Sequence, residues 1–367
     1  MERTGTPLGA RITQIALTLI IVGLVVFKVL PGIADWSEVG AALKGAPLSE
    51  LLLVLVVALG LEVLKALEQQ ILIPKLGIAR AFVALENTAL VSNLVPGPSG
   101  TTMRFVIYRS WGITSADFAK GWLVSSAFNN LLVLAMPVVG AILVITTSDV
   151  EPPPWLAGVA LIGLVATTAA VLLVIGILRS ESLARRVGSI YGRLLQKLRG
   201  LMKKPAAGQD GAEAVVRFRT DAIDAMRDSG VALALTISAK FVVTALLLWM
   251  SLDAVGFPSG YLSPAEVFAA YTFVRLLTIV NITPGSVGIA EALYASSLTY
   301  LAGPGADEAL IVAGVVVFRA ATYALPIVLG VICNIIWRRK RSWRAEVEEV
   351  ASTDAVVAAA ADTITDD

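Results

Sequence analysis

The sequence predicts an all-α integral membrane protein with six transmembrane helices and two re-entrant helical hairpins in an inverted repeat. Hydrophobic residues make up 57% and charged residues 16% of the 367-residue chain, against about 45–50% and about 25% in soluble domains. Of its 57 charged side chains, 29 lie in residues 179–229 and 338–367. Two Pro-Gly motifs of the same form interrupt apolar segments. Polar islands in an apolar chain are typical of membrane proteins.

The composition also excludes several kinds of site. The chain has no histidine and one cysteine, Cys333. His-ligated metals, Ser-His-Asp or Cys-His nucleophilic sites and an intramolecular disulfide are therefore excluded. The net charge of +1 gives no global attraction for nucleic acid. We expect no metal, no cofactor and no catalytic residue.

Membrane spans need about 20 predominantly apolar residues. The predicted spans are Ile12–Leu30, Leu48–Ile73, Ala116–Thr146, Trp155–Leu178, Gly230–Gly256 and Asp307–Trp337. The first follows Arg3 and Arg11, as a signal peptide would. Its uncharged run of 16 residues, 12–27, exceeds the usual apolar region of 7–15, which favours a retained helix.

Two further apolar segments are broken by proline and glycine. Residues 82–95 run into Pro96–Gly100, and residues 265–283 run into Pro284–Gly288, followed by a short apolar stretch, 289–301. Pro and Gly clusters end helices. Non-helical backbone at membrane depth must be buried in protein or face a cavity. Both segments are therefore predicted to be re-entrant hairpins.

The distribution of Lys and Arg orients the predicted spans. Basic residues gather before the first span, around the first hairpin, in 179–229 and after Trp337, whereas the opposite connections carry one base, Lys44. We expect a plasma-membrane protein with both termini cytoplasmic. Residues 1–338 form the membrane domain with a cytoplasmic basic loop at 179–229, and residues 339–367 form a disordered cytoplasmic tail. The basic loop either follows the positive-inside rule or recruits a partner.

The two breaks share the pattern N-x-x-P-G-x-x-G, at residues 93–100 and 281–288. The composition predicts roughly 0.002 chance occurrences of this pattern. An inverted-topology repeat, whose broken helices meet near the midplane, would be a transporter architecture. The alternative is a pair of similar loop breaks in a Gly-rich chain.

Ionisable residues inside spans are costly and usually functional. Glu62, Lys65 and Glu68 share one face of the second span, where they either contribute to a site or form a self-neutralising ladder. Lys240 lies in the fifth span and has the same two interpretations.

Three charged residues in the last third carry most weight. Arg275 precedes Pro284, Glu291 follows Gly288, and Arg319 lies midway along the last span with Tyr323 one turn on. They form either a buried Arg–Glu pair that holds the second hairpin to the last helix, or a polar cavity for a charged head group. Arg104, four residues after Gly100, is expected to lie deep beside the first break.

The segments Asn281–Glu291 and Val317–Gly330 resemble the closing signature of the lysylphosphatidylglycerol-synthase transmembrane-domain family. Residues 93–108 are similar to the family's first Pro-Gly loop, although Thr101 and Thr102 stand where members often carry an acidic residue. The resemblance covers about residues 10–338 and implies a lipid flippase fold. Members that aminoacylate lipids carry a soluble transferase domain, for which the 30 residues after Trp337 are too few.

These observations predict a non-enzymatic lipid flippase. It moves a phosphate-containing lipid, a phospholipid or a polyprenyl-phosphate type, between leaflets. Helix N-termini after the breaks and Arg side chains suit phosphate. The alternatives are a secondary transporter of a small solute or ion, a membrane-embedded glycosyltransferase, or a scaffold subunit. Expected partners are the membrane, a second copy of the chain or a separate lipid-modifying enzyme. The substrate-binding candidates are Arg104, Arg275, Glu291, Arg319, Tyr323, Asn281, Asn93, Gly97, Gly100, Gly285 and Gly288, with Glu62, Lys65 and Lys240 as secondary candidates.

Overall fold

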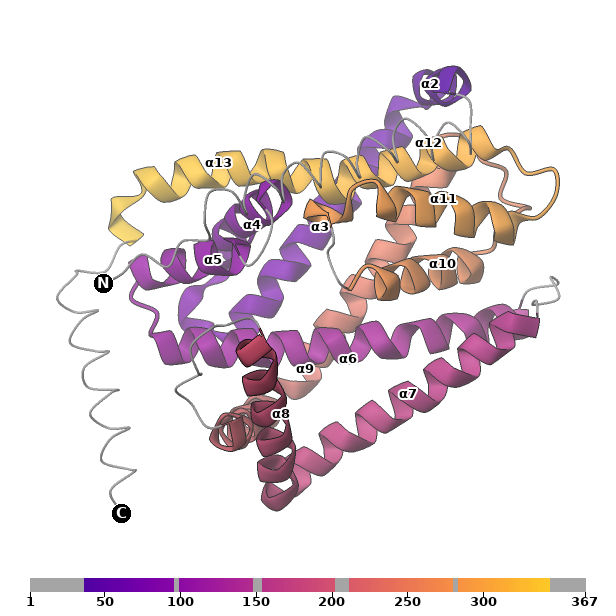
Figure 1. The fold of residues 1–367 in the computed structure, drawn as a ribbon. Helices are drawn as coiled ribbons and strands as arrows, with labels where there is room; N and C mark the ends of the chain where they lie inside the picture. Colours follow the sequence, from indigo (N-terminus) through magenta and orange to yellow (C-terminus); the bar gives the residue numbers. More distant parts are fainter. Residues whose placement is uncertain (1–35, 96–98, 148–153, 202–210, 280–282, 344–367) are drawn as a thin grey trace, which may run out of the picture.

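The computed structural model describes residues 36–95, 99–147, 154–201, 211–279 and 283–343 (Figure 1). All regular structure in these ranges is helical. The first predicted span, Ile12–Leu30, lies outside the described residues, as do Gly97, Asn281 and residues 344–367 of the tail.

Most of the described chain lies in long helices. Their bounds are α2 (Trp36–Gly45), α3 (Leu48–Leu72), α4 (Ile78–Leu94), α5 (Ser99–Ser110), α6 (Ser115–Thr147), α7 (Pro154–Arg179), α8 (Glu181–Leu201), α9 (Gly211–Ala254), α10 (Pro264–Leu277), α11 (Ile289–Ala302), α12 (Glu308–Arg319) and α13 (Leu325–Arg339). The predicted second, third and fourth spans coincide with α3, α6 and α7 to within one residue at each end. Within the described ranges, three helical stretches are long and apolar enough to cross a membrane: 115–147, 229–254 and 308–339.

The last predicted span is interrupted in its middle. A single π-helical turn at Ala320–Ala324 separates α12 from α13, and Pro326 follows at the start of α13. A π turn widens the helix by one residue, and proline removes a backbone donor, so both favour a bend here. The half before the turn packs against α11, and the half after it packs against α4.

Each predicted hairpin forms two helices separated by a break. The first consists of α4 and α5, and the second of α10 and α11 with a 3₁₀ turn at Pro284–Ser286 between them. Ser263 and Glu266 form a reciprocal capping box that starts α10. α4 packs against α13 and α11 packs against α12, with α5 beside α4 and α10 beside α11, so the hairpins lie toward opposite ends of the α12–α13 rod (Figure 1).

The first hairpin is packed closely on both sides. A Cβ at Gly330 of α13 would lie 2.5 Å from the Glu86 carbonyl oxygen and 2.6 Å from the Leu90 Cβ of α4. A Cβ at Gly100 of α5 would overlap the Ser92 hydroxyl. Asn334 donates a 2.7 Å hydrogen bond to Asn87 across the same helix pair. The end of α4 is therefore fixed between α5 and α13.

The described parts of the segment 179–229 are helical. It contains α8 and the first part of α9, which begins 19 residues before the predicted span at Gly230. The two helices approach closely at Gly188 and Gly211, where an added Cβ would lie 2.4–2.5 Å from a backbone oxygen of the other helix. Glycine permits this approach because it has no side chain. The basic residues in the described parts of the segment therefore belong to a packed helix pair.

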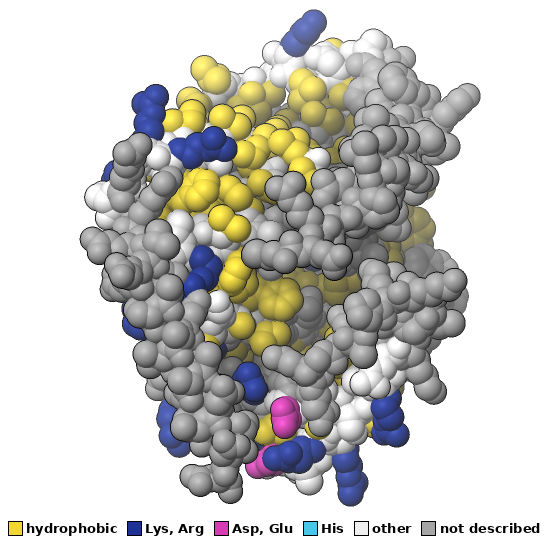
Figure 2. Space-filling view, turned by 60° about the vertical axis from the view of Figure 1, so that its left-hand side comes forward, with side chains coloured by type: hydrophobic (Ala, Val, Ile, Leu, Met, Phe, Trp, Pro, Cys, Tyr) yellow, Lys and Arg dark blue, Asp and Glu magenta, His cyan; other side chains and the backbone are white. Residues whose placement is uncertain are grey.

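The surface exposes many large apolar side chains. Leu48, Leu52 and Val56 on α3 are 71%, 51% and 63% exposed. Figure 2 shows broad areas of hydrophobic side chains on one face, with Lys and Arg side chains distributed around them. Apolar surface of this extent is typical of a face in contact with lipid. The described fold is that of an integral membrane protein.

The beginning of the predicted disordered tail is folded onto the body. The Trp343 ring meets the Trp111 ring edge to face at 5.7 Å, and Lys340 and Arg80 lie 4.5 and 5.9 Å from its centroid. Such contacts are worth about 0.5–1 kcal/mol each at exposed sites. The expectation of disorder from residue 339 is therefore wrong for residues 340–343, and residues 344–367 lie outside the described chain.

Candidate functional site where the two breaks meet

The two breaks lie against each other and against the last helix. The Tyr323 hydroxyl donates a 3.1 Å hydrogen bond to the carbonyl of Asn93, the first residue of the first motif. The Asn93 side-chain oxygen would lie 3.2 Å from a Cβ added at Gly285 in the second motif. The prediction that the broken helices meet is confirmed for these residues.

Arg319 lies at this meeting point, where its guanidinium contacts a carboxylate, a backbone carbonyl and an aromatic ring. Its Nε donates to Glu291 at 2.7 Å, and its Nη2 donates to the Gly285 carbonyl at 2.8 Å. The guanidinium also lies 4.9 Å from the Tyr323 ring centroid. The Arg319 and Glu291 side chains are each 16% exposed. The predicted Arg–Glu pair therefore exists and joins the second hairpin to the last helix.

Glu291 has a second partner at the start of α11. Its other carboxylate oxygen accepts a 2.6 Å hydrogen bond from the Gly288 backbone N–H, as the acidic residue of a capping box does. This helix N-terminus, which was expected to face a ligand phosphate, is thus occupied by an anion of the protein itself. The Glu291 carboxylate therefore accepts hydrogen bonds from both Arg319 and the N–H at the start of α11.

The backbone of the second break needs glycine. Gly285 and Gly288 have φ of 59° and 87°, and Ser286 between them has φ of 54°. A non-glycine residue is destabilised in this left-handed region because its Cβ comes too close to the backbone carbonyl oxygen. A Cβ at Gly285 would overlap the Tyr323 ring, with its Cδ2 only 2.7 Å away. Gly285 and Gly288 therefore need glycine for their positive φ, whereas Gly100 is not among the positive-φ residues and needs glycine only for close approach.

The structure places two other predicted arginines outside this contact network. Arg104 donates to the Thr88 hydroxyl at 3.3 Å and interacts with Glu68 and Tyr108. Arg275 is exposed in the last turn of α10. It interacts electrostatically with Tyr294, as do Arg319 and Glu291. Of the charged candidates, Arg319 and Glu291 therefore lie where the breaks meet, and Arg104 and Arg275 lie on the helices beside the breaks.

A second polar cluster joins α3, α6 and α9. Glu68 pairs with Lys240 and accepts a hydrogen bond from Ser125 and one of 3.0 Å from Asn129. The predicted ladder on α3 is only half present, since Glu62 and Lys65 pair at 2.7 Å while Glu68 turns to Lys240 instead. Sequence reasoning missed Ser125, although its spacing of four from Asn129 places both on one helix face.

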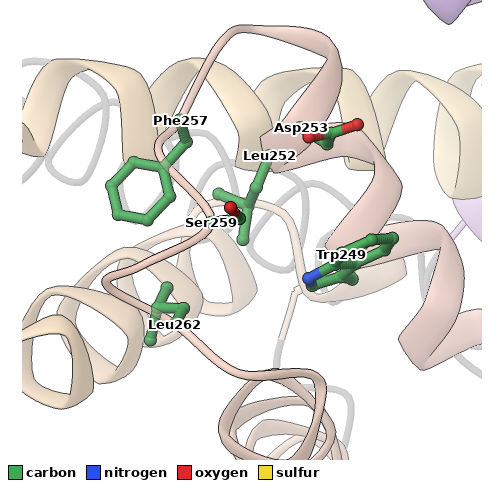
Figure 3. A pocket seen from close by; sticks show the side chains of 6 residues that line it. All are labelled: Trp249, Leu252, Asp253, Phe257, Ser259 and Leu262. Carbon is green, nitrogen blue, oxygen red and sulfur yellow. The ribbon is translucent and has the colours of Figure 1, made fainter.

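A small hollow lies apart from both clusters, at the end of α9 (Figure 3). It is lined by Trp249, Leu252, Asp253, Phe257, Ser259 and Leu262. Its walls are mainly apolar, and no predicted site residue faces it. The meeting of the breaks therefore remains the candidate site.

The sequence also matches a known protein family. The family model described as the lysylphosphatidylglycerol synthase TM region matches residues 15–330. The match includes both breaks, the Arg319–Glu291 pair and the π turn. No curated protein matches the chain. Because the family model covers most of the sequence, the chain belongs to the lysylphosphatidylglycerol synthase transmembrane-region family.

Proposed function

We propose that the protein moves a phosphate-containing amphipathic lipid between the two leaflets of the plasma membrane. Its family indicates a membrane protein with a lipid-related function. The observation that supports translocation is the internal anion at the meeting of the breaks: Glu291 accepts from the Nε of Arg319 and from the Gly288 N–H. A phosphate needs the same kind of donors.

In the proposed cycle, a lipid phosphate exchanges with the Glu291 carboxylate. Arg319 contributes a planar fork of donors that suits phosphate, and the Gly288 N–H lies at the positive end of α11. Arg104 and Arg275, at the borders of the two hairpins, guide the head group. When no lipid is bound, Glu291 returns to Arg319 and prevents an uncompensated buried charge.

The acyl chains would remain in the bilayer while the head group crosses. Exposed apolar side chains flank both breaks: Leu94 and Val95 at the end of α4, and Leu277 and Ile279 at the end of α10. A polar centre with apolar borders suits an amphipathic lipid better than a free solute. This observation favours the lipid over the alternative substrate, a small solute or ion.

The proposal includes a membrane layout of six spans and two re-entrant hairpins that enter from opposite sides as an inverted repeat. The position of the hairpins beside opposite halves of the α12–α13 rod supports it (Figure 1). The shared N-x-x-P-G-x-x-G pattern also supports it. Both termini are cytoplasmic in this layout because the positive-inside rule assigns Arg338, Arg339 and the α8 bases to the cytoplasmic side.

Reconstituted protein should move fluorescent phosphatidylglycerol between leaflets of a vesicle. An impermeant reductant then bleaches the inner-leaflet probe in protein-containing vesicles and spares it in empty ones. Fluorescent glucosylceramide, which has no phosphate, should stay in its leaflet. The exposed Arg338 provides the control, because Arg338→Gln changes the charge without touching the breaks. Export of a soluble phosphate ester without lipid movement would favour the small-solute alternative.

Cysteine labelling of intact cells should show the proposed orientation. In a Cys333→Ala background, single cysteines at Ser37 and Ser259 should react with an impermeant reagent, as should one at Ser148, outside the described residues. A cysteine at Ser189 on α8 should react only after the cells are opened. Labelling of Ser189 from outside would contradict the layout.

A further inference from the structure

A pair of buried carboxyl groups lies between α3 and α4, on the other side of α4 from the Thr88–Arg104 contact. Glu86 is 1% exposed, and neither of its carboxyl oxygens has a hydrogen-bond partner among the described residues. Its direct neighbour is the carboxyl group of Glu62 on α3, which is 2% exposed. Glu62 in turn pairs with Lys65 at 2.7 Å.

The surroundings of Glu86 contain too little positive charge for two carboxylates. From α3 it faces Glu62 and Lys65, and from α13 the Cys333 thiol lies within reach. The nearest arginine on α5, Arg104, is directed instead toward Thr88, Glu68 and Tyr108. With both carboxyls ionised, Glu62, Lys65 and Glu86 would carry a net charge of −1 in a buried place. An uncompensated buried charge is strongly unfavourable.

We propose that Glu62 and Glu86 share one exchangeable proton, and that this proton is the coupling ion for lipid movement. The Glu86 carboxyl O–H would donate to the Glu62 carboxylate, which gives one of the two orphaned oxygens a partner, removes the excess negative charge and leaves Lys65 balanced. A metal ion fits less well because hard cations need a shell of oxygen ligands. No group of three or more acidic, Cys or His side chains suited to a metal occurs within the described part of the chain.

The position of Glu86 connects the proton to the candidate site. Asn93 lies seven residues, or two helical turns, further along α4, so the two residues share a face. Asn93 bonds to Tyr323 at the breaks, and α13, which continues from the π turn, packs along Glu86 through Gly330. A change in charge at Glu86 therefore acts on the two helices that meet at the breaks. This coupling rests on the proposed function, whereas the shared proton does not.

A carbodiimide tests the shared proton without any transport measurement. Dicyclohexylcarbodiimide reacts with protonated carboxyl groups in apolar surroundings, and mass spectrometry of the full-length protein locates the adduct. We expect an adduct at Glu86 that decreases as the pH is raised, and its loss in Glu86→Gln. Glu266 is the matched control: it is also buried, but its carboxylate accepts from the Ser263 N–H at 2.7 Å and should stay unlabelled. Absence of a Glu86 adduct at every pH would overturn the shared proton.

A pH difference across reconstituted vesicles tests the coupling. For one coupled proton, a difference of about one pH unit should bias the leaflet ratio of fluorescent phosphatidylglycerol about tenfold. Glu86→Gln keeps a hydrogen-bond donor but cannot exchange a proton, so its leaflet ratio should ignore the gradient while its melting temperature stays near that of the wild type. Lipid movement by the wild type that also ignores the gradient would overturn the coupling alone. No lipid movement by the wild type under any condition would overturn the coupling together with the proposed function, and the Glu86 adduct would still decide the proton site.

Discussion

Arg319→Gln should reduce lipid movement to the level of empty vesicles and also destabilise the protein. The substitution removes the 2.7 Å bond to Glu291 and the 2.8 Å bond to the Gly285 carbonyl. Breaking one partner of a buried pair costs about 3–5 kcal/mol, and we expect about 3 kcal/mol because the pair is partly exposed. Thermal unfolding in detergent and the fluorescent-lipid assay measure the two effects separately.

The double variant separates the structural role of the pair from binding. In Arg319→Gln/Glu291→Gln both charges are gone, so stability should recover toward the wild type while lipid movement stays at background. Arg275→Gln is the matched control for stability, since Arg275 is exposed and has no ion pair among the described residues. Normal lipid movement together with normal stability in Arg319→Gln would contradict both roles.

Gly285→Ala should be the most damaging change of a single methyl group. The left-handed conformation at φ 59° costs a non-glycine residue about 1–2 kcal/mol. The new Cβ would also overlap the Tyr323 ring and approach the Asn93 side chain, and overpacking of this kind costs about 1–3 kcal/mol. The melting temperature should fall, and lipid movement should fall with it because the Tyr323–Asn93 contact is displaced.

Gly256→Ala provides the control for backbone strain. Gly256 has φ 81° and ends α9 in a left-handed cap, in which the Phe257 N–H donates to the Leu252 carbonyl. A Cβ there would have no atom within 4 Å, so this variant reports the conformational cost alone. In a Tyr323→Ala background the ring is absent. The part of the stability loss of Gly285→Ala that comes from overpacking should then disappear, and the part that comes from backbone strain should remain. If Gly285→Ala costs no more than Gly256→Ala, the close contact between the breaks is not important for stability.

Local sequence features determined the helices well. The apolar runs Leu48–Ile73 and Ala116–Thr146 match α3 and α6 to within one residue, because length and hydropathy are properties of a continuous segment. Proline and glycine placed both breaks for the same reason. The helices within 179–229 were harder to delimit, because a high density of charge is also typical of an exposed loop. The spacing of apolar residues in this segment fits the packing of helix α8 against helix α9.

Partners across the fold were harder to predict. The Arg319–Glu291 pair could be proposed because both residues are charged and lie in apolar segments close along the chain. Glu68 and Lys240 are separated by 172 positions, and their pairing depends on how α3 packs against α9. The isolation of Glu86 from positive charge is likewise a property of packing, since the sequence places Lys65 and Arg104 at similar distances along the chain.

The π turn divides the last helix between two groups of helices. The part before it, α12, packs with α11, and the part after it, α13, packs with α4, so each hairpin holds one half of the same helix. Arg319 ends the first half and Tyr323 lies within the turn. If the hairpins rock against each other, the helix must flex at residues 320–326, where a widened turn and Pro326 already weaken its hydrogen bonding. The Arg319 and Tyr323 contacts would then break and form again as the angle between α12 and α13 changes. Residues 320–326 would in that case be both the hinge of the helix and part of the candidate site.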